Sequence, residues 1–351
     1  MTPEEARELD RSTSLFHGAL IALGAQSIID SLAMWEDVPP VPGVANSGTA
    51  SRWLRTATTY VAQRRLRARD MALAYYRYQR ALATGTTIAL PGQEPVERMS
   101  LSELKREFEA MMAGPSQEPQ EGDLSVPDKQ IDVEVIDGLE EALEAEEERA
   151  EEIAEENLRI LGPQRLETFL GQPALTEGDT VERLDSNRAD AHARAGRRQA
   201  ASLERNVLNG GRGTLFLAAD RDRRALGFVR VSKTGTPCGF CAMLISRGPV
   251  LKGADREASL YRSNEGTGPK ANGEIVTYGD LDLYHDNCHC YAVPVFSLKE
   301  FETSDIFALN REYAELWPIV TDGLGGEDAL SAWRRFIRQE AKSRKAQEAA
   351  A

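Results

Sequence analysis

The chain has 351 residues and a formal net charge of -14, from 56 acidic and 42 basic side chains. This length is sufficient for two or three domains, and the 41% of hydrophobic residues can build their cores. The acidic balance argues against a protein that covers nucleic acid with its whole surface. Residues 1–5 show no basic, apolar leader, and no apolar run approaches the length of a membrane span. We therefore expect neither a signal peptide nor a transmembrane segment, and synthesis in a cytosol.

The N-terminal region is predicted to be helical. A first helix begins at Thr2, which can cap it and is followed by a proline and two acids, and it ends before Pro39. A second long helix is predicted over residues 50–83, ending at Gly85, because its apolar residues recur at helical spacing. A short helix over residues 101–112 follows.

The second helix is strongly basic. It contains a single acid, Asp70, and eight arginines, namely Arg52, Arg55, Arg64, Arg65, Arg67, Arg69, Arg77 and Arg80. Arginines interleaved with tyrosines can face DNA or an acidic protein groove. The alternative is a helix face that pairs with the acidic segment of the same chain. We take Arg64, Arg65, Arg67 and Arg69 as the candidates for contact with a partner protein or with DNA.

The middle of the chain combines a linker with an acidic helix. Residues 114–129 are rich in Pro, Gly, Gln, Ser and Glu, which predicts a flexible linker. Residues 138–156 contain ten glutamates, too many for a comfortable isolated helix. This segment is either an exposed helix that tethers a second domain or a docking surface for a basic partner.

The second half of the chain is predicted to mix helices and short strands. A helix over residues 189–208 is expected to stop at Asn209-Gly210-Gly211. Strands are predicted over residues 214–218, 226–231 and 288–296, with a long loop over 253–279. Helices return from residue 298, and the last of them is basic toward its end. The buried stripe expected for that last helix consists of Leu330, Trp333, Phe336 and Ile337.

All four cysteines lie in two groups, Cys238 with Cys241 and Cys288 with Cys290. The first pair has C-x2-C spacing, and the second belongs to an H-x2-C-x-C group that begins at His285. Together they offer more than the four soft ligands of a tetrahedral structural Zn2+ site. Zinc is therefore the predicted cofactor.

The sequence leaves the zinc ligands open. Residues two apart on a strand share a face, so Cys288 and Cys290 should point the same way and His289 the other way. Both an all-cysteine set and a set of three cysteines with His285 remain possible. Three readings without a metal compete: a redox pair of Cys238 and Cys241, two disulfides, or a reduced cluster that only packs.

Several of these segments resemble the minor head protein of phage Mu and its relatives in tailed phages, especially those of actinobacteria. The resemblance covers about residues 200–296 and, more weakly, residues 64–87. It is carried by the segments 210–212, 224–231, 237–244, 246–250 and 285–290. The family's cysteine and histidine positions correspond to Cys238, Cys241, His285, Cys288 and Cys290. His289 departs from the pattern, because many relatives have arginine there.

The resemblance implies an α+β protein with four parts. These are a helical N-terminal region (1–113), a linker with an acidic helix (114–160), a small α+β domain like that of the phage Mu protein, holding the Cys/His cluster (161–298), and C-terminal helices (299–351). It implies a minor head protein at the portal vertex that acts in procapsid assembly and in DNA packaging or ejection. The expected location is the virion, in the head interior or at the portal vertex, after assembly in the host cytoplasm. The expected partners are the portal protein, the major capsid or scaffold protein and, as a further candidate, packaged DNA, with no membrane.

Two alternative functions remain. Proteins of the actinobacterial phage group are often described as capsid maturation proteases, but the sequence has neither a Gly-x-Ser-x-Gly turn nor a His-Glu-x-x-His motif. His192, with Ser186 or Ser202, is the remaining combination for a serine protease. We therefore favour a protein without enzymatic activity and name no catalytic residue. The second alternative is a head protein that binds the end of the genome through its basic helices.

Overall fold

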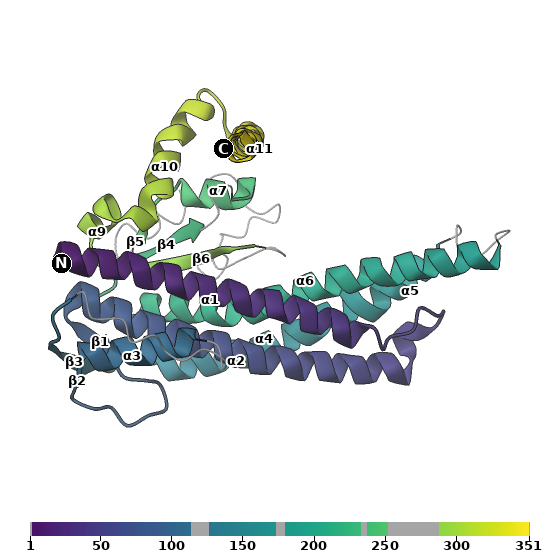
Figure 1. The fold of residues 1–351 in the computed structure, drawn as a ribbon, viewed down its shortest axis with the longest axis horizontal. Coiled ribbons are helices and arrows are strands. Elements are labelled where there is room, and N and C mark those ends of the chain that lie inside the picture. Colours follow the sequence, from purple (N-terminus) through teal and green to yellow (C-terminus); the bar gives the residue numbers. More distant parts are fainter. Residues whose placement is uncertain (1, 114–125, 173–179, 233–236, 252–287, 351) are drawn as a thin grey trace.

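The computed structural model describes residues 2–113, 126–172, 180–232, 237–251 and 288–350. It is a mostly helical α+β structure, as predicted. Four long helices lie side by side: α1 (Pro3–Trp35), α2 (Gly48–Thr84), α4 (Leu139–Arg159) and α6 (Val181–Arg221). A smaller group of elements covers one end of them, whereas α5 (Arg165–Leu170) and the first part of α6 extend away at the other end (Figure 1).

The first three predicted helices are confirmed, and their ends follow from local capping. The Thr2 hydroxyl accepts from the Glu5 backbone N–H, and the Glu5 side chain accepts in return from the Thr2 backbone. Helix α2 ends at Gly85, which has a φ of 74° and so adopts the left-handed conformation that glycine favours. The short helix α3 (Leu101–Met112) has a capping box at Ser100.

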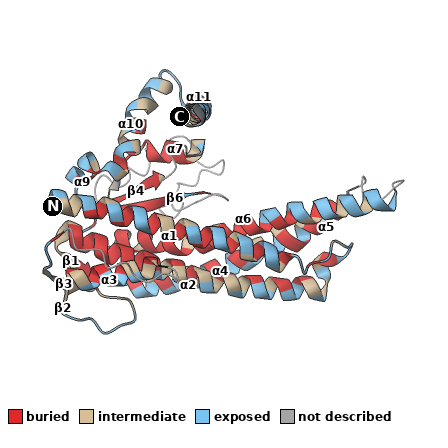
Figure 2. Ribbon diagram, in the orientation of Figure 1, coloured by how far each residue is buried: buried red, intermediate tan, exposed pale blue. Residues whose placement is uncertain are grey.

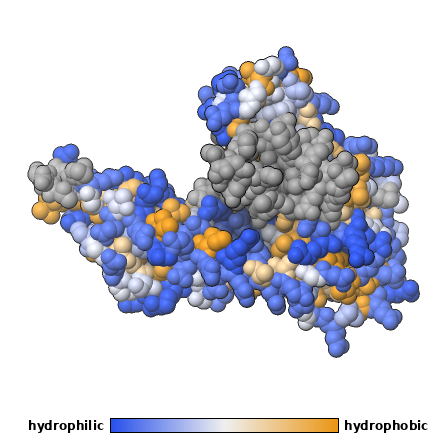
Figure 3. All heavy atoms as spheres, turned by 180° about the vertical axis from the view of Figure 1, so that it is seen from behind, coloured by the Kyte–Doolittle hydropathy of each residue, from blue (hydrophilic) through white to orange (hydrophobic). Residues whose placement is uncertain are grey.

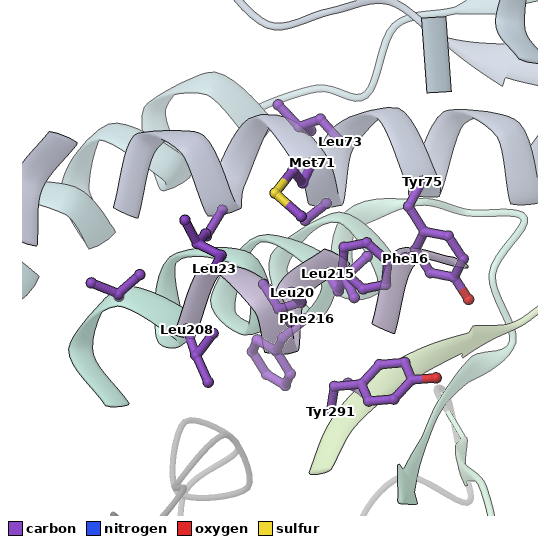
Figure 4. Close-up of a cluster of buried hydrophobic side chains, with 14 of the residues drawn as sticks. Phe16, Leu20, Leu23, Met71, Leu73, Tyr75, Leu208, Leu215, Phe216 and Tyr291 are labelled. Carbon is purple, nitrogen blue, oxygen red and sulfur yellow. The ribbon is translucent and has the colours of Figure 1, made fainter. Parts of the chain in front are cut away.

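Within the described residues, one helix, α1, has the length and composition to cross a membrane. Of the 18 consecutive residues of α1 that are most apolar, 33% are buried inside the protein. The buried side chains of α1 include Phe16, Leu20 and Leu23, which pack toward α2 and α6 (Figure 4). A core helix passes the same composition test, so this result is weak evidence for a membrane span.

Helix α6 differs most from its prediction. The expected stop at residues 209–211 and the expected strand at 214–218 are both wrong, because α6 continues without interruption to Arg221. A Cβ on Gly210 would lie 2.6 Å from the carbonyl oxygen of Arg65, and one on Gly211 would lie 3.0 Å from that of Ala68. The two glycines therefore allow the backbones of α2 and α6 to approach each other.

The acidic helix is confirmed as α4, but it is more than an exposed tether. Its buried residues Leu143, Ala154 and Leu158 belong to the main hydrophobic core. A π-helical turn (Ile160–Gln164) leads directly from α4 into α5. One face of α4 is thus fixed against the bundle, and most of its glutamates are exposed, whereas Glu146 and Glu147 are half-buried.

A small sheet was missed by the sequence analysis. It consists of β1 (Thr86–Ile88), β2 (Arg98–Ser100) and β3 (Gln130–Glu134) in the order β1-β3-β2. Strand β3 is parallel to β1 and antiparallel to β2. Most of the predicted linker, residues 114–125, lies outside the described residues. Its last part is anchored, because Val126 is buried and the Leu101 N–H donates to the Lys129 carbonyl.

The second sheet confirms two predicted strands. Its order is β5-β4-β6, with β4 (Gly227–Ser232) antiparallel to both β5 (Val250–Leu251) and β6 (Cys290–Val295). The loop predicted over 253–279 lies outside the described residues. The remaining helices of the second half are α7 (Gly239–Ile245), α9 (Leu298–Thr303), the 3-10 turn Asp305–Phe307, α10 (Ala308–Val320) and the 25-residue α11 (Gly326–Ala350). A further 3-10 turn, Val44–Asn46, lies between α1 and α2.

Two hydrophobic clusters form the interior. The main core joins α1, α2, α3 and α6 with the inner side of β4 and β6, and its buried positions follow the facing sides of the long helices (Figure 2). The second cluster joins α7 with α10 and α11 and includes Cys241, Cys288, Cys290 and Trp333. Of the stripe predicted for the last helix, Leu330, Trp333 and Ile337 are buried, and Phe336 is partly buried. The domain boundaries proposed at 113, 160 and 298 remain predictions.

Candidate metal centre

The first cysteine pair lies at the start of α7. Cys238 is the N-cap residue, and its sulfur accepts from the Cys241 backbone N–H at 3.4 Å. The Cys238 side chain is exposed, whereas Cys241 is buried in the first turn of the helix. A helix N-terminus favours negative charge, so this position stabilises thiolates.

The second pair comes from β6 and the residues just before it. Cys288 and Cys290 are buried, whereas His289 between them is exposed. This alternation confirms that the two cysteines share a face and that His289 points away. Arg212 of α6 donates to the Cys288 carbonyl, which ties this segment to the long helix.

Three sulfurs converge from these two segments. The Sγ atoms of Cys241, Cys288 and Cys290 all lie within 4.8 Å of one another, and those of Cys241 and Cys288 are 3.4 Å apart. Zn–S bonds of 2.3 Å in a tetrahedron place sulfurs about 3.8 Å apart. The donor type and spacing therefore fit zinc. The four cysteines form no disulfide with one another.

The fourth ligand stays open between two candidates. Cys238 lies on the same helix turn as Cys241 and reaches it through the backbone hydrogen bond. The other candidate, His285, lies outside the described residues. The complete set of candidates is still Cys238, Cys241, His285, Cys288 and Cys290.

The sulfurs of the cluster act on one another's pKa values. The neighbouring sulfurs of Cys238, Cys288 and Cys290, together with burial, raise the pKa of Cys241 far above its ordinary value. A hydrogen bond with Cys241 lowers the pKa of Cys290, but the Cys288 sulfur and burial outweigh it and raise that pKa to about 12. Such thiols ionise together only if a positive charge compensates them.

The protein supplies part of that charge itself. The buried Arg230 of β4 has its Nη1 4.0 Å from the sulfur of Cys241. A zinc ion bound by four thiolates would carry two net negative charges, and one bound by three thiolates and a neutral histidine would carry one. The guanidinium of Arg230 offsets one negative charge in either case.

His192 does not assemble a protease site with Ser186 or Ser202. All three lie on α6, and the two serines are six and ten residues from His192, about 9 and 15 Å along the helix axis. The His192 Nε2 lies 3.2 Å from the Trp35 carbonyl, and Ser202 is fully buried. His17 is also engaged, because its Nε2 lies 2.7 Å from the His289 carbonyl. No general base is placed beside these hydroxyls.

The four candidate arginines of α2 do not form one outward surface. Arg65 is buried and pairs with Glu147 at 3.0 Å and with Glu146 at 3.7 Å, both on α4. Arg64 pairs with an aspartate of α1, Asp30, at 3.3 Å. These contacts support the reading in which the basic helix pairs with acids of the same chain.

The other two arginines line a pocket between α2 and α3. Arg67 donates to the Met111 carbonyl at 2.7 Å, and the Nε of Arg69 is buried without a hydrogen-bond partner. The pocket has a volume of about 510 Å³ and also contains Leu73 and Leu90. Sequence reasoning missed it, because its walls come from residues far apart in the chain.

Comparisons with known proteins point to phages. Residues 174–316, which include all four cysteines, match the family model of the VG15 protein. The chain is 28% identical over 188 residues to the "Gene 15 protein" of Mycobacterium phage L5. That alignment covers 47% of this chain and 60% of the relative, so less than two thirds of the relative is spanned. No solved structure matches. Together these similarities indicate a phage protein.

Proposed function

We propose that this chain is a minor head protein of a tailed phage, associated with the portal vertex and acting in procapsid assembly and in DNA packaging or ejection. The proposal is supported by the similarity to a phage protein and by the resemblance of the Cys/His segments to the phage Mu minor head family. The observation that carries it is the convergence of Cys241, Cys288 and Cys290, because these sulfurs occupy positions of the family pattern.

In this proposal zinc has a structural role. Cys241 belongs to α7, whereas Cys288 and Cys290 belong to the β6 segment, so one ion joins two segments that are 47 residues apart. The same cysteines pack against Trp333 of α11 in the second hydrophobic cluster. Structural zinc contributes on the order of 10 kcal/mol in small peptide domains. The ion would therefore hold α7, β6 and the C-terminal helices together.

The proposed partners are the portal protein and the major capsid or scaffold protein, and the proposed location is the virion. The test is complementation of a phage that lacks the gene, with particle-bound copies counted by quantitative mass spectrometry. Cys241→Ser should abolish incorporation into heads, and His289→Ala should retain it, because the imidazole is exposed. Virions that lack the wild-type chain, or normal incorporation of Cys241→Ser, would contradict the proposal.

The protease alternative has its own test. The chain is co-expressed with capsid and scaffold proteins, and cleavage products are sought by mass spectrometry. We expect none, since His192 and Ser202 are separated along α6. Cleavage that disappears in His192→Ala or in Ser202→Ala would assign a protease function instead.

A further inference from the structure

An arginine cluster at the far end of the molecule was not singled out by the sequence. Three guanidinium groups surround the ring of Phe169 on α5, with Arg194, Arg198 and Arg165 at 4.5, 5.8 and 5.9 Å from its centroid. Arg197 is exposed beside them on α6. We call these four arginines the basic patch.

Among the described residues, the basic patch has no acidic partner. None of its four arginines forms an ion pair with another described residue, and the Nε of Arg165 is buried without a hydrogen-bond partner. The acid of α5, Glu167, is already occupied, because it accepts from the backbone N–H groups of Gly43 and Ala45. Stacking on Phe169 holds the guanidinium groups in place, but it leaves their positive charges uncompensated.

A complementary surface lies on α4. Glu144, Glu148, Glu151 and Glu155 are exposed and follow each other at spacings of four, three and four residues, which places them in one row along the helix. None of them forms an ion pair with a residue that the structure describes. We call this row the acidic ridge. It spans about 17 Å, which is long enough to face the arginines of α5 and α6.

Within the part of the chain that the structure describes, no ion pair joins the acidic ridge to the basic patch. Helix α4 lies in the bundle and runs through the turn at Ile160–Gln164 into α5, so the ridge precedes the patch along the chain. We call α5 and the first part of α6, which extend beyond the bundle, the arm. The side chains on this arm are mostly hydrophilic where it is seen from behind (Figure 3). Each copy therefore offers both halves of a charge-complementary contact.

We propose that the basic patch of one copy binds the acidic ridge of a second copy of this chain. A phosphate polymer that ran from the basic patch along α4 would meet the carboxylates of the ridge, which disfavours DNA as the occupant. The chain carries 56 acids against 42 basic residues, so a local match of opposite charges is required for two copies to associate. Such charge pairs fix the register of the contact.

The test uses the full chain and two charge-reversed variants. Sedimentation equilibrium at low and at high salt should show self-association that weakens as salt rises. Arg194→Glu/Arg198→Glu and, separately, Glu151→Arg/Glu155→Arg should each weaken self-association by about tenfold or more. Circular dichroism and thermal unfolding of each variant establish that the fold is retained.

Mixing the two variants gives the decisive result. The reversed patch of the first variant should bind the reversed ridge of the second, and their native surfaces should also bind, so the mixture should associate although neither variant does alone. A wild-type chain that stays monomeric at all salt concentrations overturns the proposal. So does a mixture of folded variants that fails to associate. Binding of a random DNA duplex that Arg194→Glu/Arg198→Glu abolishes, with a monomeric wild type, would assign the patch to DNA instead.

Discussion

The Nε of Arg80 in α2 donates to Oδ2 of Asp222, just beyond the end of α6, at 2.6 Å, and both side chains are buried. The Tyr76 hydroxyl donates to the same oxygen at 2.8 Å. Burial raises the pKa of Asp222, but the hydrogen bonds and charge of Arg80 outweigh it, and the pKa lies below its ordinary value. Arg80 is thus part of the interior and not of a DNA-binding face.

Removing this carboxylate should strongly destabilise the fold. Asp222→Ala leaves a buried guanidinium without its main partner, which costs about 3–5 kcal/mol. The free energy of unfolding from urea denaturation measures this loss. Asp132→Ala is the matched control, because its pair with Arg98 is exposed on both sides, and such pairs contribute only about 0.2–1 kcal/mol. Equal losses in the two variants would refute the assignment.

The crossing of α2 and α6 depends on Gly210. Gly210→Ala places a methyl group 2.6 Å from a carbonyl oxygen of α2, and separating the two backbones should cost about 1–3 kcal/mol. Gly213→Ala is the control on the same helix, because its Cβ meets only the Glu146 side chain at 3.6 Å. The control should gain up to about 1 kcal/mol from helix propensity. Chemical denaturation should show a lower free energy of unfolding for Gly210→Ala and an equal or higher one for Gly213→Ala. An unchanged free energy of unfolding in Gly210→Ala would contradict the close crossing.

Glu300 on α9 should make stability depend on pH. Burial raises its pKa to about 7, although the backbone N–H groups of Phe296 and Ser297 act in the opposite direction. The folded state therefore binds a proton that the unfolded state has already released. Protonated Glu300 therefore stabilises the folded state. This stabilisation is fully present below the ordinary pKa of a glutamate and is lost as pH rises through about 7.

Glu300→Gln should remove this dependence. Thermal unfolding midpoints of the wild type should fall between pH 5 and pH 8 more steeply than those of the variant, with a difference on the order of 2–3 kcal/mol in stability. Glu302→Gln on the same helix, at an exposed position, should leave the wild-type slope unchanged. Parallel pH profiles for wild type and Glu300→Gln would show that the buried carboxyl does not titrate in this range.

Metal removal should be visible in tryptophan fluorescence. Trp333 is fully buried in the same cluster as Cys241 and Cys290. Chelation of zinc from metal-loaded protein should expose Trp333 and shift its emission to longer wavelength. Trp333→Phe should lose most of this shift, whereas Trp35→Phe should keep it because Trp35 belongs to the main core. An unchanged spectrum after complete chelation would show that the packing of the C-terminal helices does not depend on the metal.

The sequence predicted best where local chemistry decides the structure. Thr2 and Gly85 mark helix ends by capping, and the alternation around His289 correctly placed two cysteines on one face of the chain. The reading of Gly210 failed because a glycine required for a close helix crossing has the same local signature as one that ends a helix. Strand β1 was missed because three residues are too few to show a period.

The cysteine ligands of the candidate metal centre could be predicted from the sequence, but the residues around them could not. Cysteine spacing indicated the soft ligands, yet nothing in the sequence joined Arg230 or Arg212 to them, because those contacts exist only after β4 and α6 are packed. The same holds for Arg65, whose partners on α4 lie about 80 residues away along the chain. Long-range pairs of this kind are not encoded in any local pattern.

The uninterrupted course of α6 has a mechanical consequence. As a 41-residue helix, it is a rod about 60 Å long, with Arg194 and Arg198 in its outer half and Arg212, bonded to the metal-centre backbone, in its inner half. A rotation of about 5° around the crossing at Gly210 would move the Val181 end, about 44 Å away, by about 4 Å. Arg212 lies two residues from this crossing and would move by less than about 1 Å. The crossing therefore holds the cysteine segment nearly in place while the outer end of α6 bends or rotates.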